Sequence, residues 1–487
     1  MKILLIFPGH TQNTPTLPFS ILVLASYLRK RNIAVDLLDT RVADYKTINY
    51  NDYLLIGVSA KSGEQLSSGI EVCRWIRKHS RTQIVFGGPH ATFFPEQTCK
   101  SPLVDYVVKG EGEVTLYELA CALQTGGEIS DIRGLVYQRG GKVCVNPERP
   151  FMNMGDLEIP AYDLVDLNLY QDSFRYFTIE TSRGCPYRCS FCYVHDFHHR
   201  RWRTKSVPQS IGEIKQVHEQ YGIEKFFICD DNFFVKKERV LAFLQAILDA
   251  GLQIEIFAQA RADYFAGYTD SELGLIAKAG VKFVAMGAES GSQRILDGIK
   301  KDITTEDILR SAGNCIRFNM IPIYSFMIGI PGEKESDLSK TIDMYFKLKA
   351  ISPCVEINGF YIFTPYPGTP VYHETIKQGY KPHTTLEEWA NWNFSDFSNL
   401  PWLSRQDKQR LPVLSKIIMF LFIWDRFLSY GSDFKRKKLG AWHLNLIWDT
   451  ASRLLLLDAR IRLKKRWFRY GYEWLLFGKI AARFKVT

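Results

Sequence analysis

Three cysteines lie close together in the stretch TSRGCPYRCSFCYVHDF, which covers residues 181–197. Cys185 and Cys189 are separated by three residues, and Cys189 and Cys192 are separated by two. The other seven of the ten cysteines lie singly and far apart along the chain. Thiolates at this spacing on one loop can all turn toward a single centre, so the stretch predicts a metal site.

The spacing alone is compatible with two kinds of metal centre. Zinc is one, because Cys189 and Cys192 form a CxxC pair and histidines follow closely, but a structural zinc site normally has four protein ligands. The other is a [4Fe–4S] cluster, in which three cysteines leave one iron open to a substrate or cofactor. The aromatic residues Tyr187, Phe191 and Tyr193 would shield such a cluster from water. The pattern favours the cluster over zinc, and a site without metal is the third alternative.

The first part of the chain alternates strand patterns with helical ones. Short apolar runs occur in KILLIFP, AVDLLD, YLLIGVS, TQIVFGG and DYVVKGEGE. This alternation predicts parallel strands in a doubly wound, Rossmann-like sheet, whose ligands bind in loops beyond the carboxyl ends of the strands. Here those loops are FPGH, GVSAKSG, GGPHATFFPE and KGEGEVT. Their small residues let a large ligand approach the backbone, and simple tight turns are the alternative.

A second series of strand and helix patterns follows. Its strands are expected near residues 176–182, 224–229, 254–259, 281–287, 323–329 and 355–362. Six such units predict an α/β fold with a partial (βα)6 barrel of the TIM type, whose active site would lie at the carboxyl ends of the strands. The cysteine stretch begins directly after the first of these strands. We expect four regions: a sheet domain at 1–144, a linker at 145–172, a barrel at 173–385 and a helical C-terminal region at 386–487.

The cysteine stretch resembles the CxxxCxxC signature of the radical S-adenosylmethionine enzymes. The segments FFICDDNFF, MGAESGSQRIL, FMIGIPGE and PYPGTPVY look like the same superfamily. The first domain, with GGPHAT and KGEGE, resembles the cobalamin-binding domain of one subgroup. That subgroup includes the anaerobic magnesium-protoporphyrin monomethyl ester cyclase and many cobalamin-dependent methyltransferases. The resemblance covers about residues 1–380.

This resemblance implies cofactors and their contacts. Cys185, Cys189 and Cys192 would hold a [4Fe–4S] cluster, and its open iron would bind S-adenosylmethionine for reductive cleavage to a 5′-deoxyadenosyl radical. The implied contacts to S-adenosylmethionine are Asp230, Arg261, Glu289, Gly329 and Gly332. The implied contacts to cobalamin are Ser59, Gly87, Gly88, His90, Gly110, Glu111 and Gly112.

Some of these assignments have alternatives. Asp230 could cap a loop, and Arg261 could form a structural ion pair. The chain has no DxHxxG pattern, although His10 and His90 lie in suitable loops. Cobalamin would therefore bind without a protein histidine on cobalt, and a sheet that has lost cobalamin altogether is the alternative.

The positive charge of the chain lies at its end. Residues 431–487 carry 14 Lys and Arg against 4 Asp and Glu, which accounts for the whole net charge of +10. Basic segments rich in Trp and Leu are typical of helices on membrane surfaces, and a helical cap with a solvated basic face is the alternative. With no signal peptide and no apolar run long enough to span a bilayer, we expect a cytoplasmic protein, with peripheral contact at the inner membrane face. Nothing in the sequence resembles a nucleic-acid recognition motif.

The sequence therefore predicts an enzyme that uses a [4Fe–4S] cluster, S-adenosylmethionine and cobalamin. The favoured reaction is methylation of an unactivated carbon in a small molecule, and the tail suggests a lipid, an isoprenoid or another apolar substrate. A radical oxidative cyclase or rearrangement enzyme is the alternative among enzymes, and a cobalamin- or zinc-binding sensor is the alternative of another class. A reductant such as flavodoxin or ferredoxin would supply electrons.

Overall fold

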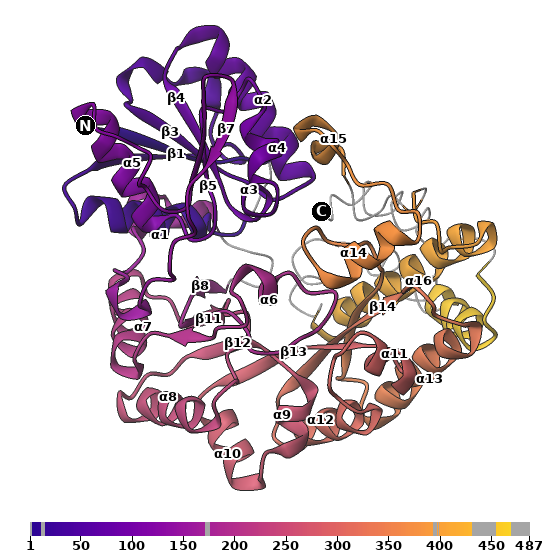
Figure 1. The fold of residues 1–487 in the computed structure, drawn as a ribbon. Helices are drawn as coiled ribbons and strands as arrows, with labels where there is room; N and C mark the ends of the chain where they lie inside the picture. Colours follow the sequence, from indigo (N-terminus) through magenta and orange to yellow (C-terminus); the bar gives the residue numbers. More distant parts are fainter. Residues whose placement is uncertain are drawn as a thin grey trace, which may run out of the picture. The chain divides into compact units, whose positions relative to one another are not determined.

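The structure is a computed structural model that describes residues 2–10, 15–170, 176–392, 397, 399–430 and 454–468 (Figure 1). The chain divides into two compact units, which are described separately. Unit 1 contains residues 1–186, 193–231 and 381–396. Unit 2 contains residues 187–192, 232–380 and 397–487.

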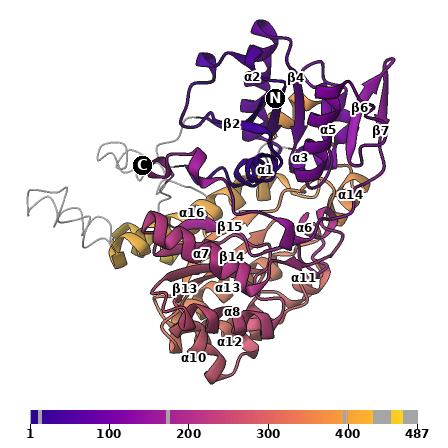
Figure 2. The same ribbon diagram turned by 90° about the vertical axis from the view of Figure 1, so that its left-hand side faces the viewer.

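Unit 1 contains a seven-stranded sheet with the order β2-β1-β3-β4-β5-β6-β7. Its parallel strands are β1 (Lys2–Phe7), β2 (Ala34–Asp39), β3 (Leu55–Ser59), β4 (Gln83–Gly87) and β5 (Tyr106–Val108). These five strands confirm the doubly wound sheet expected from the sequence. The antiparallel strands β6 (Leu135–Arg139) and β7 (Lys142–Val145) extend one edge as a hairpin that we did not predict (Figure 2).

Helices cover both faces of this sheet. They are α1 (Phe19–Arg29), α2 (Glu64–His79), α3 (Pro89–Phe93), α4 (Pro95–Cys99) and α5 (Glu113–Thr125). The helices α1 and α5 pack on one face, where Ile21 and Leu119 join Leu5 and other strand residues in one apolar core. Gly69 of α2 packs near Val58, whose side chain points to the opposite face from Leu5. Because both faces are covered, the strands are nearly continuous apolar runs.

A second sheet contains six strands in the order β15-β14-β13-β12-β11-β8. These strands are β8 (Phe177–Ile179), β11 (Lys225–Ile228), β12 (Glu255–Ala260), β13 (Val281–Glu289), β14 (Ile321–Ile328) and β15 (Glu356–Ile362). All six expected strands are present, and the pairs β8–β11, β12–β13, β13–β14 and β14–β15 are parallel. The arrangement confirms the partial barrel of six βα units.

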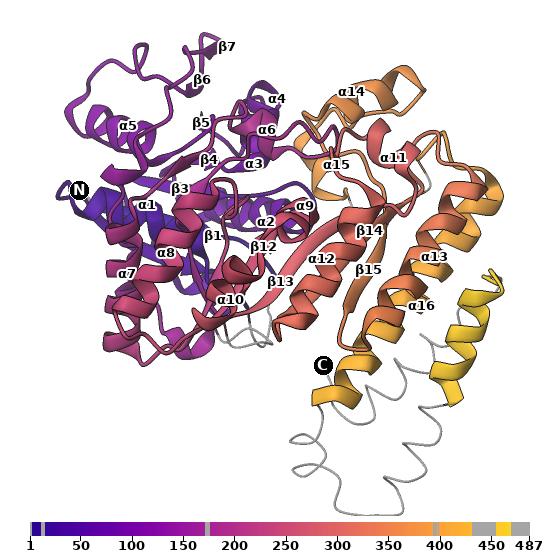
Figure 3. The same ribbon diagram turned by 90° about the horizontal axis from the view of Figure 1, so that it is seen from below.

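Helices alternate with these strands. The principal ones are α7 (Val207–Tyr221), α8 (Lys237–Asp249), α10 (Asp270–Lys278), α12 (Thr305–Arg317) and α13 (Glu335–Ile351). Figure 3 shows α12 and α13 alongside β14 and β15. The start of α12 follows from its sequence, because the Thr304 hydroxyl accepts from the Asp307 N–H at 3.0 Å while Asp307 accepts from the Thr304 N–H at 2.8 Å. This reciprocal capping satisfies donors that the first helical turn cannot.

The described part of the C-terminal region is helical, as expected. It contains α15 (Leu386–Ala390), α16 (Arg405–Tyr430) and a helix over residues 454–464. None of the described helices combines the length and the apolar composition needed to cross a bilayer. Most of the basic tail, residues 431–453 and 469–487, lies outside the described residues.

Candidate functional site

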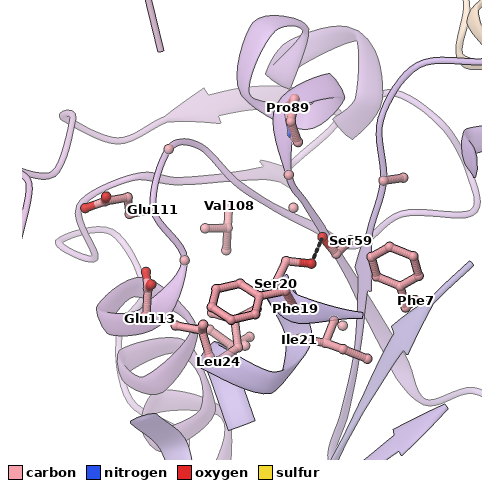
Figure 4. Close-up of a pocket in the computed structure, with 18 of the residues that line it drawn as sticks. Phe7, Phe19, Ser20, Ile21, Leu24, Ser59, Pro89, Val108, Glu111 and Glu113 are labelled. Carbon is pink, nitrogen blue, oxygen red and sulfur yellow. Dashed lines mark hydrogen bonds between the residues drawn. The ribbon is translucent and has the colours of Figure 1, made fainter. Parts of the chain in front are cut away.

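A cavity of about 320 Å³ lies in unit 1 at the carboxyl ends of β3, β4 and β5. Its apolar floor is formed by Leu5, Ile21, Leu24, Val85, Val108 and Leu116. Polar groups stand at its sides, among them Glu111 and Glu113, and the Ser20 and Ser59 hydroxyl oxygens are 3.2 Å apart (Figure 4). An apolar cavity with a few convergent polar groups is typical of a cofactor site.

Six of the seven residues predicted to bind cobalamin line this cavity. They are Ser59, Gly87, Gly88, Gly110, Glu111 and Gly112. The seventh, His90, is buried outside the cavity lining, and its Nδ1 is 2.9 Å from the Ser62 hydroxyl. Burial lowers the pKa of His90 to about 3, so the ring is neutral at physiological pH.

Three glycines of the cavity lining leave space that a side chain would fill. Gly88 has a φ of +90°, and a Cβ there would lie 2.9 Å from the Ala60 carbonyl oxygen. At Gly87 and Gly110 a Cβ would meet no atom within 4 Å, so a side chain at either position would enter open space. These residues form a cradle of bare backbone and therefore fit a large cofactor such as cobalamin.

One side of the cavity is a network of buried charges. Arg183 of β9 (Ser182–Arg183) donates to Glu111 at 3.2 Å, to Glu113 at 2.8 Å and to Glu180 at 2.9 Å. Arg203 donates to both carboxylate oxygens of Glu111, at 2.6 and 3.0 Å. Burial alone would raise the pKa of Glu111, but Arg183 and Arg203 outweigh burial and hold that pKa below its usual value.

Two other carboxyl groups in the cavity wall titrate near neutral pH. Burial raises the pKa of Glu180 to about 7, although Arg183 opposes the change. Burial likewise raises the pKa of Asp231 to about 6. Both groups can therefore exchange protons at physiological pH beside a bound ligand.

Asp230 anchors the backbone that leads into the cysteine stretch. Its carboxylate accepts from the Thr181 N–H and hydroxyl, both at 2.6 Å, and from the Ser182 hydroxyl at 2.5 Å. The neighbouring Asp231 accepts from the Gly184 N–H at 2.8 Å. Asp230 thus has the loop-anchoring role that was the alternative in the sequence, and its contact with S-adenosylmethionine stays a prediction.

The cysteine stretch contains the three predicted cluster ligands. Cys185, Cys189 and Cys192 are all partly exposed. Within the described ranges, no three His, Cys, Asp or Glu side chains are arranged to hold one metal ion. A [4Fe–4S] cluster presents a separate iron to each thiolate, and the three cysteines stay its predicted ligands.

In unit 2, the loop from Tyr187 to Cys192 is fixed to the segment around residue 300. The Ser190 N–H donates to the Ile299 carbonyl at 2.9 Å. Arg188 donates two hydrogen bonds to Asp302, at 2.9 and 3.1 Å. Phe191 packs against an apolar cluster that includes Ile299. The segment before Cys192 is thus held by backbone, charge and apolar contacts together.

Arg261 brings a positive charge to Cys189. Its guanidinium lies 3.9 Å from the Cys189 sulfur and 3.7 Å from the centre of the Tyr187 ring. Arg261 also donates to Asp263 at 3.0 Å and to the Asp302 carbonyl at 2.8 Å. The structural ion pair considered from the sequence is therefore present, while pairing of Arg261 with S-adenosylmethionine stays a prediction.

Glu289, at the end of β13, forms a buried ion pair. Its carboxylate accepts from Lys301 at 2.8 Å, and its backbone has a φ of +62°. A Cβ at Gly287 would lie 2.0 Å from this carboxylate, so only glycine leaves room for the pair. Burial would lower the pKa of Lys301, but the charges of Glu289 and Cys189 outweigh burial and raise it. Strained backbone around a buried ion pair is typical of a functional site.

The two glycines predicted near S-adenosylmethionine differ in their surroundings. Both have positive φ, +71° at Gly329 and +80° at Gly332. The Trp402 indole donates to the Gly329 carbonyl at 2.8 Å, and the Gly329 N–H donates to Glu333 at 2.6 Å. At Gly332 a Cβ would meet nothing within 4 Å. Gly332 is therefore the more accessible of the two.

The sequence interpretation missed Arg183 and Lys301. Arg183 lies in the cysteine stretch, whereas Lys301 lies beyond the segment MGAESGSQRIL. The role of Arg183 depends on partners distant in sequence, because it pairs with Glu111 and Glu113 across 72 and 70 residues. No spacing rule in a single sequence reveals such pairs.

Comparisons with known proteins match both parts of the chain. The radical SAM superfamily model matches residues 179–345, and the B12 binding domain model matches residues 10–120. The uncharacterized methyltransferase PH0819 of Pyrococcus horikoshii is 32% identical over 409 residues, which cover 80% of this chain and 87% of that protein. The anaerobic magnesium-protoporphyrin IX monomethyl ester cyclase of Synechocystis sp. is 29% identical over 276 residues, which cover 55% of this chain and 54% of the cyclase.

Two solved structures share the fold. The cobalamin-dependent S-adenosylmethionine radical enzyme OxsB, with aqua-cobalamin and S-adenosylmethionine bound, matches with a TM-score of 0.74 at 18% identity over 99% of this chain and 75% of OxsB. The radical S-adenosylmethionine methyltransferase TsrM from Kitasatospora setae matches with a TM-score of 0.64 at 22% identity over 77% of this chain and 76% of TsrM. At such identities the likeness concerns the fold alone.

Proposed function

Because the chain belongs to the radical S-adenosylmethionine enzymes that carry a cobalamin-binding domain, we propose that it methylates an unactivated carbon of a small molecule. The chain is an enzyme of this class, and its cofactors are a [4Fe–4S] cluster, S-adenosylmethionine and cobalamin. The observation that carries the proposal is the 32% identity to a methyltransferase over 87% of that relative.

The cofactors supply the reactive chemistry: when bound, the cluster delivers the electron that cleaves S-adenosylmethionine, and cobalamin carries the methyl group. In this proposal, Cys185, Cys189 and Cys192 hold the cluster. Arg261 adds positive charge beside Cys189, to which its guanidinium lies 3.9 Å away. A positive charge at this distance stabilises a thiolate ligand and raises the reduction potential of the cluster. A flavodoxin or ferredoxin is the proposed reductant.

In unit 1, the glycine cradle and the apolar floor would hold cobalamin. The wall of the same cavity would hold and move protons, because the pKa values of Glu180 and Asp231 lie at about 7 and about 6. A protonated carboxyl group donates a hydrogen bond to an amide of the ligand, whereas the ionised form accepts one. Glu180 and Asp231 could therefore donate a hydrogen bond to an amide oxygen of the ligand or accept one from an amide N–H.

Product analysis tests the reaction. The protein would be reconstituted anaerobically with iron, sulfide and hydroxocobalamin, and incubated with reductant, an extract of the cells that make it and S-adenosylmethionine with a deuterated methyl group. We expect S-adenosylhomocysteine and 5′-deoxyadenosine together, and a small molecule that gains the deuterated methyl group in mass spectrometry. Formation of 5′-deoxyadenosine without S-adenosylhomocysteine would support the cyclase or rearrangement reaction instead. Absence of both products, with cobalamin bound, would support a sensor.

We also propose that the substrate is apolar and that the enzyme meets it at an anionic membrane surface on the cytoplasmic side. Support comes from the helix over residues 454–464, on which Leu454, Leu457 and Ile461 are 61%, 55% and 43% exposed. Their spacing places them on one face of the helix. The exposed Lys464 and Lys465 follow on the same segment, as on helices that lie on anionic lipid.

Vesicle sedimentation tests this membrane contact. The triple variant with Leu454, Leu457 and Ile461 replaced by serine should lose most binding to vesicles of equal parts phosphatidylcholine and phosphatidylglycerol. The matched control replaces three other exposed apolar residues, Leu169, Ile351 and Tyr361, by serine and should bind like the wild type. Equal binding of both variants, or no binding of the wild type, would contradict the proposed contact.

A further inference from the structure

A segment that follows the barrel series in sequence packs against the cavity domain. Residues 381–392, here called the strap, follow the last helix of the barrel series yet belong to unit 1 with the cavity. The strap contains α15, which packs against α2. It is separated from the cavity loops by about 300 residues of sequence, so its contacts there are made by folding alone.

Trp389 is the centre of the strap and is fully buried. Its ring stacks on Phe94 with a centroid distance of 4.6 Å and an interplanar angle of 28°. His90 meets the same ring at 6.1 Å, and the His383 ring of the strap meets it at 4.9 Å. Aromatic pairs at these distances stabilise packing beyond the area that they bury. The turn and short helix α3 that follow β4, here called the β4 loop, therefore rest on the strap.

The loop that follows β3 also rests on the strap. The Gly63 N–H donates to the Trp389 carbonyl at 2.9 Å. Gly63 has a φ of +89°, and a Cβ there would lie 2.7 Å from the Trp392 carbonyl oxygen. Only glycine allows this approach, since both the backbone angle and the space exclude a side chain.

The same two loops are bonded to each other on the cavity side. The Ala60 N–H donates to the Gly87 carbonyl at 3.1 Å, and the His90 N–H donates to the Ala60 carbonyl at 3.3 Å. Ala60, Gly87 and Gly88 line the cavity, whereas His90 and Gly63 do not. Each loop thus presents one end to the cavity and the other end to the strap.

His90 contacts both the β3 loop and the strap. Its Nδ1 pairs with Ser62 of the β3 loop, and its Nε2 has no hydrogen-bond partner among the described residues. The ring lies 5.6 Å from Phe94 and 6.1 Å from Trp389, so His90 packs against the strap while it bonds to the β3 loop.

We propose that the strap positions both loops for cobalamin and that Trp389 is the positioning residue. The inference rests on the proposed function, because it takes cobalamin as the ligand of the cavity. Trp389 does not line the cavity, so it would act only through the loops that it holds. The expected consequence is a loss of cobalamin affinity without a change in the cluster.

The test is titration of the full-length protein with hydroxocobalamin, followed by absorbance, with the cluster measured as iron content. We expect Trp389→Ala to weaken binding by about tenfold, and Trp389→Phe to restore most of the affinity because a phenyl ring can still stack on Phe94. Trp424→Ala is the matched control, since Trp424 is equally buried, in α16 of unit 2, and should change thermal stability but not cobalamin affinity.

The affinities of the variants test the role of Trp389, and cobalamin binding by the wild type tests the cavity assignment. Wild-type affinity in a folded Trp389→Ala variant would overturn the positioning role, as would an equal loss in Trp424→Ala. A wild-type protein that binds no cobalamin would instead contradict the cavity assignment itself. Iron content should be equal in all variants, and its loss in Trp389→Ala alone would show that the strap acts on the whole fold and not on the cobalamin loops.

Discussion

Replacing Cys189 by serine is expected to abolish [4Fe–4S] binding and, with it, cleavage of S-adenosylmethionine. A serine hydroxyl is a poor ligand for iron compared with a thiolate, and two remaining cysteines cannot hold a cluster. Mutation of a residue that only hydrogen-bonds to a metal ligand lowers metal affinity by about 10- to 100-fold. Loss of a ligand itself should therefore lower cluster affinity by more than about a hundredfold. Cys189 is also the thiol that the Arg261 guanidinium approaches at 3.9 Å. The variant would leave Arg261 with Asp263 as its anionic partner.

The measurements are iron and sulfide content, absorbance near 400 nm and formation of 5′-deoxyadenosine after anaerobic reconstitution. Cys354→Ser is the control, because Cys354 is exposed and lies outside the cysteine stretch. It should retain cluster and turnover. A Cys189→Ser variant that keeps its iron would refute the assignment of the cluster to this stretch.

The arrangement of both sheets could be predicted from the sequence because apolar strands repeat between helical segments. In the second sheet the expected positions agree closely with the observed ones, as for β12 at Glu255–Ala260. The hairpin of β6 and β7 was missed because its apolar run is short: β6 begins with buried Leu135, Val136 and Tyr137 but ends in exposed Gln138 and Arg139. The strand β7 reads KVCV, and none of its residues is fully buried. An edge strand needs little burial, so composition gives little signal.

The sequence allowed prediction of site residues that act through their backbone. It did not allow prediction of residues whose role depends on the direction of the side chain. Gly87, Gly88 and Gly110 lie at or just after the ends of strands, and their role depends on small size alone. His90 lies only two residues after Gly88, but its ring turns to the packed side of the loop, toward Phe94. Which way a side chain turns depends on partners far away in sequence, here Trp389 in the strap. A single sequence does not contain that information in a readable pattern.

Replacing Arg183 by methionine is expected to destabilise the protein by about 3–5 kcal/mol at pH 8. Methionine fills much of the same space but leaves Glu111, Glu113 and Glu180 without their shared partner. The Arg183 side chain is only 11% exposed, so water cannot replace the lost hydrogen bonds fully. The control is Arg139→Met, which removes an exposed pair with Glu128 and should change the free energy of unfolding far less.

The pH dependence distinguishes lost charge pairing from lost packing. Arg183 lowers the pKa of both Glu111 and Glu180, so in the variant both values should rise. Glu180 already has a pKa of about 7 in the wild type, so a further rise of this pKa makes the variant less stable than the wild type as the pH increases through and above about 7. Urea unfolding at pH 5 and pH 8 should therefore show a larger difference from the wild type at pH 8 than at pH 5. A difference that does not change with pH would mean that Arg183 stabilises unit 1 by packing, and that the carboxylates of the cavity wall tolerate each other without it.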